Sequence, residues 1–232
     1  SDPQTFQKSV GGSPTNVAIG TARYGHKTAV ITGVASDALG EFAIAELKKF
    51  SVSTEFVIKT PTGKTPIVVA GIKDPDNPEF SFYRDSSAPD TKVENSEALT
   101  KAVQSAKYFW FTGSTLSQTP LSNTVIELLK ARSGEVISDL DYRPSFWSSP
   151  EIAHKDISAA VKYATIAIGN LEECAVATGL PKNSSAAEFA AALLSMGPKL
   201  AIVKGGSTGV LVAHGNSATA IPGLRIKTKC GL

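Results

Sequence analysis

The stretch that decides the fold reads Ala164-Thr165-Ile166-Ala167-Ile168-Gly169-Asn170-Leu171-Glu172-Glu173. A short β-rich run is followed at once by residues with a helical pattern, which continue to Thr178 and stop at Gly179. A glycine just beyond the last turn is a typical helix end. The stretch therefore predicts a strand over Ala164–Ile168 followed directly by a helix over Leu171–Thr178.

The same alternation extends in both directions along the chain. We predict strands at Thr28–Thr32, Lys107–Thr112, Glu135–Leu140, Leu200–Lys204, Val210–His214 and Ser217–Ile221, and helices over 16–24, Leu39–Phe50, 96–105, Pro120–Arg132 with Thr119 as cap, the residues after Pro150, and Ala186–Met196. Strands that alternate with helices are typical of an α/β fold with a largely parallel sheet covered by helices. The last three strands have short connections, which favour antiparallel pairing.

One region breaks this alternation. Two strand-like runs, Thr65–Ile72 and Glu79–Tyr83, are joined by the turn-rich segment Asp74–Pro78, and this pattern predicts a hairpin. In open α/β sheets, ligands sit beyond the carboxyl ends of the strands. We therefore expect the inserted hairpin to project from the domain and to act as a lid.

Composition excludes several classes of protein. The chain has 232 residues, 42% of them hydrophobic, and a formal net charge of +2 with scattered Lys and Arg, so we expect no nucleic-acid partner. No apolar run approaches the roughly 20 residues that cross a bilayer. Cys174 and Cys230 lack the spacing of a metal or redox motif, which indicates free thiols. We therefore expect a cytoplasmic protein with no membrane partner.

Near the amino terminus, Gly11-Gly12-Ser13-Pro14-Thr15-Asn16-Val17-Ala18 has two adjacent glycines beside an amide side chain. Glycines let a backbone come close to a ligand, and the amide of Asn16 suits a polyhydroxylated ligand. A glycine-rich turn before a helix capped by Thr15 or Asn16 explains the same residues. Both interpretations stay open for this segment alone.

Polar residues also follow two predicted strands in the middle of the chain. Thr112-Gly113-Ser114-Thr115 follows one, and Asp139-Leu140-Asp141-Tyr142-Arg143-Pro144 follows the next. Extended alternation would place Asp139, Asp141 and Arg143 on one side. The arginine forms a structural ion pair in one interpretation, and in the other the carboxylates position it to bind a substrate carboxylate or phosphate.

Two later loops suit a nucleotide. Asn170 and Glu173 have the spacing of a capping box, which explains them as helix caps, yet the same geometry could meet phosphates and Mg²⁺-bound waters. The loop Lys204-Gly205-Gly206-Ser207-Thr208-Gly209 has more glycines than a hairpin turn needs, which suggests a backbone cradle for a nucleotide. Because the lysine precedes the glycines and no helix follows, this loop is not a Walker A motif.

These elements, in this order, resemble the ribokinase family of carbohydrate kinases over almost the whole chain. The resemblance implies a ribokinase-like three-layer α/β/α fold with a mostly parallel central sheet, in one domain over 1–232 with a β lid at 62–85. Within the family, Phe82-Tyr83-Arg84 and the segment from Asp139 to Trp147 are most similar to kinases of 5-dehydro-2-deoxygluconate, an intermediate of inositol catabolism. Kinases of 2-keto-3-deoxygluconate are close behind.

The resemblance implies transfer of the γ-phosphoryl group of ATP to a primary hydroxyl of a keto-sugar acid, with Mg²⁺ bridging phosphates. Two arginines give the acid a cationic partner. The residues it implies for the substrate are Gly11, Gly12, Asn16, Tyr83, Arg84, Ser114, Asp141 and Arg143, and those for the cofactor are Asn170, Glu173, Lys204, Gly206 and Gly209, with Glu173 also organising Mg²⁺ through water. A homodimer that pairs through the lid is a further expectation.

The family pattern also includes two segments that we expect to lie outside this chain. One is a first strand before Gly11, and the other is the anion hole with the catalytic aspartate, the general base, after Leu232. Asp139 and Asp141 match the substrate loop and are not assigned that role. The other possibility is a non-catalytic sugar- or nucleotide-binding protein, whereas a dehydrogenase is disfavoured because a Gly-x-Gly-x-x-Gly motif is missing.

Overall fold

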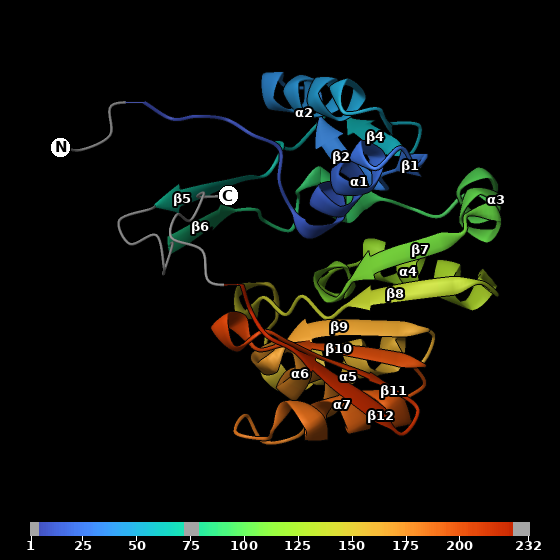
Figure 1. The fold of residues 1–232 in the computed structure, drawn as a ribbon. Helices are drawn as coiled ribbons and strands as arrows, with labels where there is room; N and C mark the ends of the chain where they lie inside the picture. The colour runs from blue at the N-terminus through green and yellow to red at the C-terminus, as the bar shows by residue number, and fades with distance from the viewer. Residues whose placement is uncertain (1–4, 72–78, 225–232) are drawn as a thin grey trace. The chain divides into compact units, whose positions relative to one another are not determined.

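The computed structural model describes residues 5–71 and 79–224 (Figure 1). Contacts divide the chain into two compact units. The first consists of Ser1–Ile67 and Arg84–Val93, and the second of Val68–Tyr83 and Glu94–Leu232. In the described ranges, none of the helices has the length and apolar character required to cross a membrane.

The first unit pairs short parallel strands and packs two helices on them. Its elements are α1 (Ser13–Arg23), β1 (Thr28–Ala29), β2 (Thr32–Ala35), α2 (Ala38–Lys49), β3 (Val52–Ser53), β4 (Val57–Thr60) and the 3₁₀ turn η1 (Pro89–Lys92). Strand β1 pairs with β3, and β2 pairs with β4. Buried Ala18 of α1 and Leu47 of α2 join Val30 and Val52 in one apolar cluster, which holds both helices to the strands.

The second unit contains the main sheet. Its strands are β7 (Tyr108–Thr112), β8 (Glu135–Asp139), β9 (Ile166–Asn170), β10 (Leu200–Lys204), β11 (Val210–His214) and β12 (Ser217–Ile221). They lie in the order β12-β11-β10-β9-β8-β7. The four strands from β7 to β10 are parallel, and β11 and β12 continue the sheet in antiparallel fashion. The prediction of a mostly parallel α/β sheet is confirmed.

One helix precedes the first strand of this sheet, and four helices lie in the connections between its parallel strands. They are α3 (Glu97–Ser105), α4 (Leu121–Ala131), α5 (Pro150–Val161), α6 (Leu171–Thr178) and α7 (Ala186–Ser195), with 3₁₀ turns η2 (Gly113–Ser117), η3 (Pro144–Phe146) and η4 (Gly206–Thr208). Helix α7 contacts β10 and β11, α6 contacts β9 and β10, and α5 packs on α6 (Figure 1). Ile157 of α5, Phe189 of α7 and Val203 of β10 are almost fully buried, which places the core between these helices and the sheet.

The inserted strands form a separate two-stranded sheet of β5 (Ile67–Gly71) and β6 (Glu79–Tyr83). Phe82 of β6 meets Phe146 of η3 edge to face, with ring centroids 5.4 Å apart. The predicted turn at 74–78 lies outside the described residues. The pairing of β5 with β6 confirms the predicted small β insertion, and its action as a lid stays a prediction.

Several predicted boundaries are wrong. Helix α1 begins at Ser13, and its N-cap is Gly12 with a φ of 92°, so neither Thr15 nor Asn16 caps it. The single strand predicted at Thr28–Thr32 is the two short strands β1 and β2. Sequence patterns also missed β3 and β4, because strands of two and four residues are too short to show a period. Helix α4 begins one residue late, with Pro120 rather than Thr119 as its N-cap.

Candidate functional site

The ends of three parallel strands bring polar residues together at one edge of the main sheet. Lys204, the last residue of β10, is paired in register with Asn170, the last residue of β9. Asp139, the last residue of β8, is paired with Ile168 of β9. Because these strands are parallel, their carboxyl ends lie side by side, and this edge is where ligands bind in open α/β sheets.

Glu173 lies at the start of α6, directly after this edge. Asn170 and Glu173 form the predicted capping box: the Asn170 side chain accepts from the Glu173 N–H at 2.8 Å, and Glu173 Oε2 accepts from the Asn170 N–H at 2.7 Å. Helix capping is therefore confirmed, whereas a role in binding phosphate stays a prediction.

The carboxylate of Glu173 is more buried than a helix cap requires. The residue is only 5% exposed, and burial raises the pKa of its carboxyl despite the Asn170 N–H and the charge of Lys204, which act in the opposite direction. The Nζ atom of Lys204 lies 3.6 Å from Glu173 Oε2 and 4.0 Å from Asp139 Oδ1. One ammonium group therefore faces two buried carboxylates.

Asp141 forms a second cluster in the loop after β8. Ser114 Oγ donates to Asp141 Oδ2 at 2.6 Å, and Arg143 Nε donates to Asp141 Oδ1 at 2.9 Å. Asp141 has a φ of 29°, in the left-handed region that non-glycine residues rarely adopt. Its carboxylate is buried, and the side chain of Arg143 is 48% exposed. The cluster thus anchors the guanidinium at Nε while much of the side chain faces solvent.

The structure brings Asp141 and Arg143 together, whereas Asp139 lies near a different cation, Lys204. The turn at Asp141 ends the extended alternation that would have placed all three side chains on one side, and Asp139 faces Lys204 instead. Asp139 does not belong to the site predicted from the sequence. The available signal was its place at the end of a predicted strand, whereas Lys204, which lies 4.0 Å from it, comes from β10, on the far side of β9 in the sheet.

The loop after β10 lines a cavity of about 380 Å³ whose walls include three of the predicted nucleotide residues. Its lining residues are Lys204, Gly206, Gly209, Val210, Ile221, Pro222 and Gly223. Gly209 has a φ of 102°, and a Cβ atom there would lie 2.0 Å from the carbonyl oxygen of Ile221. Gly209 is therefore required by packing against β12, whereas Gly206 is exposed at the cavity.

The remaining predicted substrate residues are in other parts of the chain. Gly11, Gly12 and Asn16 are exposed around the start of α1 in the first unit. Arg84, also in that unit, donates from Nε to Asp90 Oδ2 at 2.7 Å, so part of its guanidinium is used within the chain. Tyr83 is exposed at the end of β6 in the second unit. Each unit thus carries part of the predicted site.

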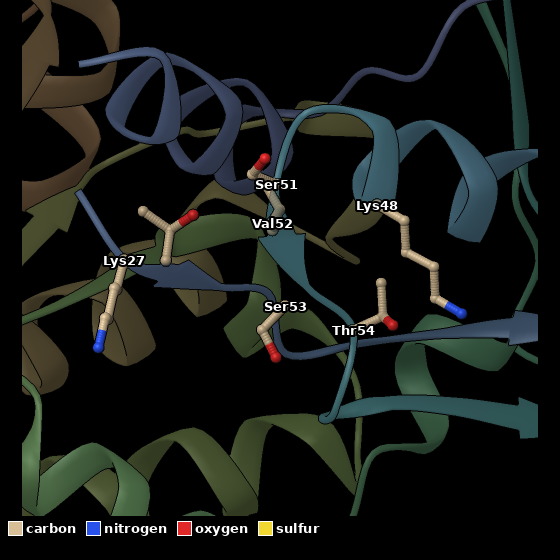
Figure 2. Close-up of a pocket in the computed structure, with 7 residues that line it drawn as sticks. Lys27, Lys48, Ser51, Val52, Ser53 and Thr54 are labelled. Carbon is tan, nitrogen blue, oxygen red and sulfur yellow. The ribbon is translucent and has the colours of Figure 1, made fainter. Parts of the chain in front are cut away.

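A second cavity of about 440 Å³ lies in the first unit, around β1 and β3 (Figure 2). It is lined by Lys27, Thr28, Lys48, Ser51, Val52, Ser53 and Thr54, none of which belongs to the predicted site. Figure 2 shows that the amino groups of Lys27 and Lys48 point in different directions. These two charges therefore do not converge on a common ligand.

The donor set fits Mg²⁺ held through water and phosphate rather than in a protein cage. Within the described ranges, no three side chains of the His, Cys, Asp and Glu types lie together as a metal-binding group. Glu173 supplies a buried carboxylate 3.6 Å from Lys204, which lines the cavity after β10. Since Mg²⁺ commonly keeps several waters and binds through one or two carboxylates plus phosphates, this sparse set suffices.

The comparisons with known sequences point to one family. The model of the pfkB family of carbohydrate kinases matches residues 1–230. The 5-dehydro-2-deoxygluconokinase of Geobacillus kaustophilus is 35% identical over 176 residues, which are 74% of this chain and 52% of that protein. The enzyme of the same name from Halalkalibacterium halodurans is 30% identical over 98% of this chain and 70% of its own length. The chain spans about half the length of the first curated relatives it matches.

Solved structures give the same fold. A PfkB protein from Polaromonas sp. superposes with a TM-score of 0.83 at 23% identity, over 97% of this chain and 76% of that one. A fructokinase from Vibrio cholerae, in a form bound to fructose, ADP and calcium ion, gives a TM-score of 0.82 at 25% identity, over 97% of this chain and 72% of that one. A sugar kinase from Pyrococcus horikoshii in complex with ATP gives a TM-score of 0.79 at 25% identity, over 97% of this chain and 71% of that one. The predicted ribokinase-like fold is confirmed.

Proposed function

The chain belongs to the pfkB family of carbohydrate kinases, and from this premise we propose that its protein transfers the γ-phosphoryl group of ATP to a primary hydroxyl of a keto-sugar acid. The acceptor we propose is 5-dehydro-2-deoxy-D-gluconate, with 2-keto-3-deoxygluconate as the alternative. The names of the curated relatives at 30–36% identity support this choice.

The observation that supports an acid substrate is the Ser114–Asp141–Arg143 cluster. Asp141 uses one carboxylate oxygen for Ser114 and the other for Arg143 Nε. In this proposal Arg143 binds the substrate carboxylate, because a guanidinium held at Nε keeps further N–H donors for a bidentate contact. Asp141 then acts on the substrate indirectly, because it fixes the orientation of the Arg143 guanidinium.

The other acceptor contacts in the proposal come from both units. They are Gly11, Gly12 and Asn16 for the sugar hydroxyls, with Tyr83, Arg84 and Ser114 toward the acid end. The exposed amide of Asn16 provides both donors and an acceptor for hydroxyl groups. The guanidinium of Arg84, whose Nε donates to Asp90, supplies the positive charge in this proposal.

The nucleotide side of the proposed site consists of Asn170, Glu173, Lys204, Gly206 and Gly209. The cavity at Gly206 combines the ammonium of Lys204 with the apolar Val210 and Ile221, a combination that suits a ligand with both a phosphate and a hydrophobic base. Mg²⁺, when bound, neutralises the charge of the transferring phosphate, and Glu173 would hold its waters. The general base is assigned to none of the described residues, since Asp139 and Asp141 are both oriented toward cations of the chain.

The small sheet of β5 and β6 is proposed as a lid that excludes water from the reaction. Val68, Phe80 and Phe82 are large apolar residues exposed on it. Pairing of two lids in a homodimer would cover such residues, so we propose this as the route to an oligomer.

The test is a panel of acceptors offered to the full-length gene product with Mg²⁺ and ATP, read as ADP release. We expect the highest kcat/KM with 5-dehydro-2-deoxygluconate, followed by 2-keto-3-deoxygluconate. A clear preference for ribose or fructose would reject the acid substrate. Nucleotide binding without turnover of any acceptor would favour the non-catalytic alternative.

A further inference from the structure

Four polar side chains after β7 and β8 form a chain of hydrogen bonds that runs from the core to the surface. Thr112 Oγ1 lies 3.0 Å from Ser114 Oγ, and Ser114 Oγ donates to Asp141 Oδ2 at 2.6 Å. Arg143 Nε donates to the other oxygen of Asp141 at 2.9 Å. Thr112, at one end, is fully buried, whereas the side chain of Arg143, at the other end, is 48% exposed.

The direction of this chain follows from the protons that each group carries. The carboxylate of Asp141 can only accept, and the single hydroxyl proton of Ser114 is donated to it. The contact between Thr112 and Ser114 must therefore use the proton of Thr112, with the oxygen of Ser114 as the acceptor.

Ser114 is thereby left with acceptor capacity alone. A hydroxyl oxygen has two lone pairs, and in the part of the chain that the structure describes Thr112 is the one donor to Ser114 Oγ. Ser114 is half-buried, so the second lone pair is within reach of a ligand. A ligand group that contacts this oxygen must be a hydrogen-bond donor.

We propose that Ser114 is a specificity-determining residue, which selects a sugar acid with a hydroxyl near its carboxylate against one with a ketone there. This rests on the proposed function, in which Arg143 binds the substrate carboxylate. Ser114 and Arg143 share the carboxylate of Asp141, so Ser114 contacts the substrate at the carbons nearest its acid group. Thr112 is a positioning residue, because it acts only through Ser114.

The two candidate acids differ at these carbons. After its carboxylate, 5-dehydro-2-deoxygluconate has a methylene and then a hydroxyl, whereas 2-keto-3-deoxygluconate has a ketone and then a methylene. The hydroxyl can donate to Ser114, but the ketone oxygen is a second acceptor, so that pair forms no hydrogen bond. Leaving polar groups unpaired in a closed site reduces transition-state binding by about 10- to 100-fold.

The experiment compares kcat/KM for the two acids, with the full-length protein, Mg²⁺ and ATP. We expect wild type to prefer 5-dehydro-2-deoxygluconate by about tenfold or more. Ser114→Ala removes the acceptor and should bring the ratio of the two kcat/KM values close to one. Isothermal titration with each acid in the absence of ATP gives a second readout, because the two Kd values must follow the same order.

Asp141→Asn should reverse the direction of the hydrogen bonds. Its amide oxygen still accepts from Arg143, while its amide nitrogen donates to Ser114 and releases the serine proton for a ketone. We expect the ratio to shift by about tenfold or more toward 2-keto-3-deoxygluconate, although loss of the charge raises KM for both acids. Asparagine also tolerates the φ of 29° at this position, so the variant carries the test if Ser114→Ala does not fold.

Ser117→Ala is the matched control. Ser117 Oγ donates to the backbone oxygen of Ser114 at 2.8 Å, so this variant disturbs the same 3₁₀ turn and retains the Ser114 hydroxyl. It must leave the ratio at the wild-type value. Thr112→Val should lower the ratio by a smaller factor than Ser114→Ala, and Thr112→Ser, which keeps the donor, should restore it.

Equal kcat/KM values for the two acids in wild type would overturn this proposal and would still support a kinase of keto-sugar acids. An unchanged ratio in Ser114→Ala, or an equal fall in Ser117→Ala, would also overturn it, because Ser114 would then serve the structure alone. Phosphorylation of neutral sugars only is a different outcome, which would refute the proposed function and this proposal with it.

Discussion

Helices α6 and α7 begin with the same local structure but differ in what surrounds it. Both have a capping box: Asn170 with Glu173 on α6, and Ser185 with Glu188 on α7. The glutamate accepts from the N-cap N–H at 2.7 Å in both helices. Glu188, however, is exposed, whereas Glu173 is buried beside Lys204 and Asp139.

This difference appears in the acidity of the two glutamates. Hydrogen bonds from Ser185 lower the pKa of Glu188, as expected for a carboxylate that only caps a helix. Burial raises the pKa of Glu173 in spite of the equivalent bond from Asn170. Helix α7 thus shows what a capping box requires, and the burial and the lysine at α6 are additional features that capping does not explain.

The largest expected effect comes from Glu173→Gln with Glu188→Gln as its matched control. Glutamine keeps the acceptor for the N-cap N–H, so each substitution removes the charge and retains the cap. We expect Glu173→Gln to lower kcat of the full-length protein about 100-fold or more, with a Tm change of no more than about 2 °C. Glu188→Gln should leave kcat unchanged and should lower Tm by no more than about 2 °C. A large loss of Tm with unchanged kcat in Glu173→Gln would show that Glu173 serves only to cap α6.

The second-largest effect is expected from Arg143→Ala, which removes a charged side chain that belongs to neither capping box. We expect KM for the sugar acid to rise about 10- to 100-fold, because a charge-assisted contact to the substrate is lost. KM for ATP should stay close to the wild-type value, since Arg143 belongs to the Asp141 cluster and does not line the cavity proposed for the nucleotide. Steady-state kinetics with each substrate varied in turn measure this. Equal increases in both KM values would indicate a structural ion pair.

A smaller effect is expected when the N-cap residues themselves are replaced. Asn170→Ala and Ser185→Ala each remove the side-chain acceptor for a backbone N–H in the first turn of a helix, at a cost of about 1 kcal/mol. Both should lower Tm by about 2–4 °C in thermal unfolding. Only Asn170→Ala should also lower kcat, because it alone leaves Glu173 less well held. Loss of activity in both variants would mean that the assay reports stability alone.

The smallest effect is the pH dependence of the cap at α7. The folded-state pKa of Glu188 lies below its ordinary value of 4.5, so the ionised carboxylate stabilises the fold above that pH. This contribution is lost as pH falls through the lowered folded pKa. Thermal unfolding should show Glu188→Gln less stable than wild type at neutral pH, with the difference vanishing in acid. A difference that grows toward low pH would contradict the assigned direction.

Sequence patterns predicted most of the second unit, because its helix ends are set by neighbouring residues. Gly179 ends α6 in the left-handed conformation that favours glycine, and Asn170 and Glu173 meet across one helical turn. The first unit was predicted less well. Gly12, rather than Thr15 or Asn16, is the N-cap of α1, and β3 has only two residues, too few to show a pattern.

The sequence by itself determined the order of strands and helices in the main sheet, the capping box at α6 and the polar residues at strand ends, since these depend on contacts within a few residues. Only the tertiary structure decided which carboxylates are buried and which cation each one faces. Lys204 reaches Glu173 and Asp139 because β10 lies next to β9, and β9 next to β8. Electrostatic interactions act across strands that are distant in sequence, so no local pattern could have shown that two similar capping boxes lie in such different surroundings.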